Sequence, residues 1–178
     1  MGTPQEPKKP VRSGIIEELE NLLTSGYGKK EDLRALDKTL REQYYVELNA
    51  LHHQWEKIYL EVLEAGQTAI GRECKLAIQT IDRLATAVNR ADYGYTPLFD
   101  RVTKIQNEAL TRVLEYDKGL AQSLTQLSQD MTNAEAALKA STWPMLSSLV
   151  DALNHDLAAF EENWRKRNQV MNDNMERS

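Results

Sequence analysis

The chain has 178 residues, of which 41% are hydrophobic and 28% are charged, and its formal net charge is −5 at pH 7. This size suits one domain, and the apolar fraction excludes a wholly disordered protein. Acidic and basic residues are interleaved along the chain rather than collected in a basic block, so we expect no dedicated nucleic-acid binder.

Cysteine content and the first residues bear on the location of the protein. The single cysteine, Cys74, cannot form an internal disulfide, and the first residues lack the apolar core of a signal peptide. No stretch approaches the roughly 18 to 20 apolar residues that are needed to span a bilayer. We therefore expect a cytoplasmic protein that is soluble or peripheral to a membrane.

The first residues differ in composition from the rest of the chain. Residues 1–12 hold three of the five prolines and an excess of basic charge, which is typical of a mobile tail. The pattern predicts one helical domain over residues 13–178. Ser13 can cap a short first helix, which ends at the glycines after Ser25 and has one apolar stripe, formed by Ile15, Ile16, Leu19, Leu22 and Leu23.

The longest feature is a helical pattern from Lys29 to Asp92. Its apolar residues recur at steps of three and four, which is the period of one helix face. A continuous helix over this range would be roughly 95 Å long. The sequence leaves open whether the helix is continuous or breaks between Gly66 and Gly71.

Two further helices follow, from Pro97 to Ser141 and from Trp143 to about Met175. Because the connections are short, successive helices should run antiparallel. The prediction is an all-α, elongated antiparallel bundle of three long helices plus a short N-terminal helix, with coiled-coil-like packing. Folding the chain about residue 95 places Gly71 close to Gly119.

Unequal helix lengths in this arrangement leave residues 81–109 as a two-helix arm with apolar stripes. Such an exposed apolar surface favours a second chain, so we expect a homodimer or a partner helix. Alternatively, the aromatic residues at the tip of the arm pack on each other and close the hairpin. The candidate partner contacts are Leu84, Val88, Tyr93, Tyr95 and Phe99.

Motifs that carry chemistry are mostly missing from the sequence. It has no glycine-rich phosphate loop, nucleophile elbow, His-Glu-x-x-His helix or zinc spacing, so we expect no enzyme and no cofactor. Cys74 has no histidine nearby in sequence and is expected to be an inert thiol. The strongest metal-like cluster contains Glu47, His52, His53 and Glu56.

This cluster does not match a metal site inside a helical bundle. Di-iron bundles use Glu-x-x-His motifs on several helices, and the chain contains no such motif. We therefore expect a partly buried histidine beside Trp55 rather than a metal site.

Three functional classes remain open. The first is a non-enzymatic protein-interaction module, a scaffold or adaptor that acts through helix faces and self-associates. The second is a peripheral membrane-shaping dimer, because the long antiparallel helices resemble the general plan of BAR-type dimers; the basic triplet Arg165-Lys166-Arg167 could contribute a membrane patch, whereas the three glutamates of the first helix oppose one. The third is a small-molecule-binding helical bundle.

Overall fold

The computed structural model describes residues 10–25, 30–90 and 104–173, and every regular element among them is a helix. The elements are α1 (Val11–Ser25), α2 (Lys30–Glu64), α3 (Thr68–Arg90), α4 (Lys104–Lys139) and α5 (Trp143–Asp173). The predicted all-α class is confirmed. No helix in the described residues has a stretch long and apolar enough to cross a membrane.

The long second helix of the sequence prediction is two helices, because the chain reverses at Gly66. Gly66 has a φ angle of 73°, a left-handed conformation that glycine adopts without steric cost. Its N–H donates to Leu63 O at 2.9 Å, and Gln67 N–H donates to Val62 O at 3.1 Å. These bonds satisfy carbonyl groups at the end of α2, as in a helix C-terminal cap.

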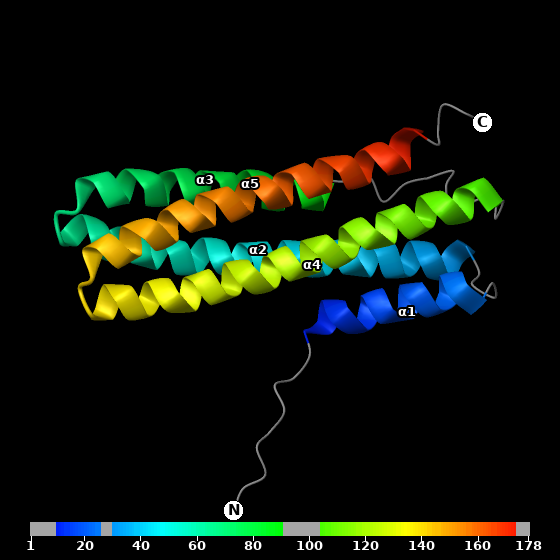
Figure 1. The fold of residues 1–178 in the computed structure, drawn as a ribbon, viewed down its shortest axis with the longest axis horizontal. Helices are drawn as coiled ribbons and strands as arrows, with labels where there is room; N and C mark the ends of the chain where they lie inside the picture. Colours follow the sequence, from blue (N-terminus) through cyan, green and yellow to red (C-terminus); the bar gives the residue numbers. More distant parts are fainter. Residues whose placement is uncertain (1–9, 26–29, 91–103, 174–178) are drawn as a thin grey trace, which may run out of the picture.

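This reversal changes the architecture. α3 packs along α2 instead of extending it (Figure 1). The expectation of three long helices is therefore wrong, and the alternative of a break at the first glycine is correct. The apolar period continues on both sides of the turn, which is why the pattern alone reads as one helix.

Four helices form a bundle, and α1 is added at its edge. α2 packs against α3 and α4, and α5 packs against the same two helices, so the order around the bundle is α2, α3, α5, α4. α3 runs parallel to α5, and α2 runs parallel to α4 (Figure 1). α1 contacts both α2 and α4.

Apolar side chains from all five helices form one continuous core. Trp55 is fully buried at its centre, and the ring of Tyr44 meets that of Phe160 edge to face at 6.5 Å between centroids. Burying a side chain of this kind contributes about 1.5–3 kcal/mol. The helices of one chain are therefore enough to form this core.

The expected two-helix arm is wrong, because α3 packs against both α2 and α5. Leu84 is 1% exposed and Val88 is fully buried, because α3 lies between α2 and α5. Neither side chain therefore forms the exposed apolar surface that the prediction of a partner contact requires. The other three candidates, Tyr93, Tyr95 and Phe99, lie outside the described residues.

The expected pairing of Gly71 with Gly119 is also wrong. A Cβ atom at Gly71 would lie 2.9 Å from Leu63 Cδ2, whereas one at Gly119 would lie 3.7 Å from Asn163 Nδ2. Gly71 therefore allows close approach of α3 to α2, and Gly119 faces α5. The two glycines serve different helix contacts because the chain reverses at Gly66.

α1 begins at Val11, before the predicted cap at Ser13, whose N–H bonds to Pro10 O at 3.0 Å. Arg12 is only 4% exposed and pairs with Glu47 of α2. Its Nη2 also donates to Thr125 Oγ1 of α4 at 2.6 Å. Arg12 thus belongs to the folded domain, and the predicted tail over residues 1–12 ends too late.

Candidate functional site

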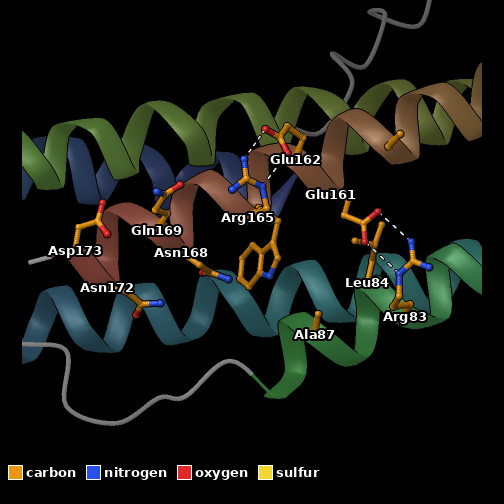
Figure 2. Close-up of a pocket in the computed structure, with 12 residues that line it drawn as sticks. Arg83, Leu84, Ala87, Glu161, Glu162, Arg165, Asn168, Gln169, Asn172 and Asp173 are labelled. Carbon is orange, nitrogen blue, oxygen red and sulfur yellow. Dashed lines mark hydrogen bonds and ion pairs between the residues drawn. The ribbon is translucent and has the colours of Figure 1, made fainter. Parts of the chain in front are cut away.

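An open groove of about 740 Å³, lined by described residues, lies between α3 and α5 (Figure 2). It forms because α3 has 23 residues whereas its parallel neighbour α5 has 31. The last turns of α5 extend beyond Arg90, where α3 ends. Part of the α5 surface is therefore not covered by α3.

Ion pairs form the wall of the groove. Arg83 of α3 donates two hydrogen bonds to Glu161 of α5, at 3.1 and 3.0 Å. One turn further along, Arg165 donates to Glu162 at 2.9 and 2.8 Å. These hydrogen bonds hold the pKa of Glu162 at about 2, well below its usual range. Both pairs are exposed, so they orient side chains more than they stabilise the fold.

Amide side chains dominate the far end of the groove. Asn168, Gln169 and Asn172 follow one another along the last turns of α5, and Asp173 ends the helix. Asn168 and Asn172 extend toward the side on which α3 ends (Figure 2). Each amide both donates and accepts hydrogen bonds, so this surface can bind a polar backbone or another amide-rich surface.

Trp164 connects the groove to a buried ionic network. Its ring lines the groove and lies 5.3 Å from the guanidinium carbon of Arg167, which is a cation–π distance. Arg167 is 2% exposed; its Nε donates to Asp117 Oδ1 at 2.7 Å, and its Nη2 pairs with Asp37. One guanidinium thus joins α5 to α4 and α2.

Further hydrogen bonds complete the network around the two carboxylates. Arg41 Nε donates to Asp37 Oδ2 at 3.0 Å, and Tyr44 Oη donates to Asp117 Oδ1 at 3.1 Å. Burial raises the pKa of Tyr44 well above its usual value and also raises the pKa of Asp117, although Arg167 opposes the second shift. The buried, paired charges of the network thus join α2, α4 and α5.

This network corrects the expected basic patch at residues 165–167. Arg167 points into the bundle, and both Arg165 and Lys166 pair with Glu162. The three residues therefore form no common basic face for a membrane. The sequence signal that was missed is spacing: Arg167 falls on the apolar stripe of its helix, three residues after Trp164 and four before Met171.

The predicted metal-like cluster is only partly assembled. Glu47 pairs with Arg12, whereas His52, His53 and Glu56 lie close together on the outer side of α2.

Cys74 is fully buried, and burial raises its pKa to about 11, which agrees with the expected inert thiol.

A second cavity lies under α1 and is apolar. Its walls come from α1, α2 and α4, with Asp37 and Asp117 of the ionic network at its base. Its volume is about 20 Å³, which is enough for roughly one water molecule. This crevice therefore has no room for an organic ligand.

No protein-family model matches the chain, and no curated protein or solved structure matches it significantly.

Proposed function

We propose that this chain is a non-enzymatic protein-interaction module that self-associates, with the groove between α3 and α5 as the contact surface. The observation that carries the proposal is the composition of this groove, which has acidic and basic side chains where α5 runs beside α3 and amides on the last turns of α5. Such a surface can recognise a polar partner through ion pairs and amide hydrogen bonds.

Charge balance favours a second copy as the partner. The groove contains the bases Arg83 and Arg165 and the acids Glu161, Glu162 and Asp173. In a twofold dimer the same patch meets itself, so each base must find an acid in the symmetry-related patch. A surface with both signs interspersed meets this condition, whereas a surface of one sign would repel its copy.

The amides add a second form of self-complementarity. Asn168 and Asn172 are one helical turn apart, so two antiparallel copies of α5 can align them face to face. Trp164 and Ala87 supply apolar contact behind them. The resulting interface would be polar and hydrated, as is common where the partners also exist as folded monomers.

A pair of variants tests this proposal. Asn168→Asp combined with Asn172→Asp would bring four additional carboxylates together across a twofold axis. Gln129→Asp combined with Asn133→Asp places the same charge on exposed residues of α4. Size-exclusion chromatography with light scattering over a concentration series should give twice 20.3 kDa for the wild type and the α4 variant.

The α5 variant should stay at 20.3 kDa over the same concentrations. A wild type that is monomeric at every concentration would exclude self-association. A dimer that is unaffected by the α5 variant would place the interface elsewhere on the molecule.

A further inference from the structure

His52, His53 and Glu56 form a three-residue cluster on the outer side of α2. At about 100° per residue, the fourth residue after His52 lies between the directions of His52 and His53. One potential ligand atom from each side chain lies within 4.8 Å of the others. The cluster is independent of the α3–α5 groove and shares no residue with it.

The distances within the cluster suit a transition metal. Zinc bonds of about 2.0–2.2 Å in tetrahedral geometry place two ligand atoms roughly 3.3–3.6 Å apart. Glu56 Oε2 lies 3.6 Å from His52 Nδ1 and 3.4 Å from His53 Nδ1. His53 is 73% exposed at its side chain, so its ring can rotate to close the remaining distance between the imidazoles.

Both imidazoles approach one carboxylate oxygen, and their rings are nearly perpendicular, at 87°. A proton on each ring or one shared cation can hold this arrangement. Two nitrogens and one oxygen favour zinc and its neighbours in the periodic table over magnesium or calcium, which prefer oxygen ligands alone.

We infer that His52, His53 and Glu56 bind one divalent transition-metal ion of the zinc class. Three ligands leave at least one coordination position open to water or to an external group. Because all three ligands lie on α2, the metal does not link two helices of the chain. The site therefore acts at the surface of the bundle, and folding does not depend on it.

Isothermal titration of the chelator-treated protein with ZnCl2 tests this inference. We expect one zinc ion per chain at pH 7.5, weaker binding at pH 5.5 because protons compete for the imidazoles, and no measurable heat with MgCl2. His53→Asn and Glu56→Gln should each weaken zinc binding at least about tenfold. His155→Asn is the matched control, since His155 is 86% exposed on α5, outside the cluster.

Histidine side-chain NMR provides a second test of zinc binding at this cluster. Zinc should shift the ring resonances of His52 and His53 and leave those of His155 unchanged. The inference is overturned if the wild type takes up no zinc, or if His53→Asn and Glu56→Gln bind zinc as tightly as the wild type. Far-UV circular dichroism should confirm that both variants are folded, because their side chains are exposed.

Discussion

Arg167 shows how one residue in a core position determines the packing of several helices. It is 2% exposed and pairs with Asp117 and Asp37 from two other helices. Arg167→Met would leave Asp117 buried without a cation and Asp37 paired with Arg41 alone, which costs about 3–5 kcal/mol in the free energy of unfolding. Urea denaturation should show this loss.

The control for this prediction lies two residues away. Arg165→Met removes an exposed arginine whose partner is on the same helix, so the free energy of unfolding should change little. Similar losses for the two variants would mean that the Arg167 network is not a determinant of packing.

Asp130 should make stability depend on pH. It is 4% exposed; Gln126 donates to its Oδ1 at 2.9 Å, and its Oδ2 has no hydrogen-bond partner among the described residues. Burial, together with the neighbouring Asp156, raises the pKa of Asp130. A raised pKa in the folded state stabilises the protein below the unfolded-state pKa, and this stabilisation is lost as the pH rises through the folded-state value.

Asp130→Asn should therefore raise the free energy of unfolding by about 1 kcal/mol at pH 7. This gain in the free energy of unfolding should vanish at low pH, where the wild-type carboxyl is protonated in both the folded and the unfolded state. Thermal unfolding across this pH range measures the difference, with the exposed Asp151→Asn as control. If Asp130→Asn were destabilising by the same amount at every pH, the assignment of a raised pKa would be wrong.

At the scale of elements, the turn between α2 and α3 determines the fold. Gly66→Val would place a β-branched residue at a φ of 73°, which costs about 1–2 kcal/mol. Gly14→Ala is the contrasting change: Gly14 lies within α1, and a Cβ there would meet no atom within 4 Å. It should stabilise the protein by up to about 1 kcal/mol.

Chemical denaturation of both variants measures the two effects, which should have opposite signs. If Gly66→Val were neutral, or if it increased the molecular length, the chain would tolerate or prefer a continuous α2–α3 helix.

Helical periodicity predicts the class and most of the core, because the apolar stripes of α2 to α5 follow the 3.6-residue period. It does not predict the reversal at Gly66, since the same period holds on both sides of it. Nor does it place Arg12, whose partner Glu47 is 35 residues away. The local pattern predicts which face of each helix is apolar. Which helices pack together depends instead on the turns and on charges that are far apart in the sequence.

The candidate site was less predictable than the fold. The sequence pattern places Leu84 and Val88 on an exposed arm only if α2 and α3 form one long helix, and the break at Gly66 buries both side chains instead. The groove arises from the difference in length between α3 and α5. That difference is visible only once the two helices are known to be parallel neighbours.

At the scale of the whole molecule, the described helices form a bundle with its own core, so partner binding is not needed to cover apolar stripes. The proposed dimer depends instead on a polar surface that is complementary to itself. Its affinity should fall with added salt, because exposed ion pairs are screened. A dimer held by apolar helix faces would show little such dependence.

The most direct test is a spin-label distance measurement between copies of the chain. Gln169→Cys places a reactive thiol in the groove, whereas the native Cys74 is buried and has a raised pKa, so the label should attach only at residue 169. We predict a short, well-defined interchain distance, and a longer one for a label at the exposed Gln129 of α4. The absence of interchain coupling at residue 169, at concentrations where the wild type has twice the chain mass, would contradict the proposed interface.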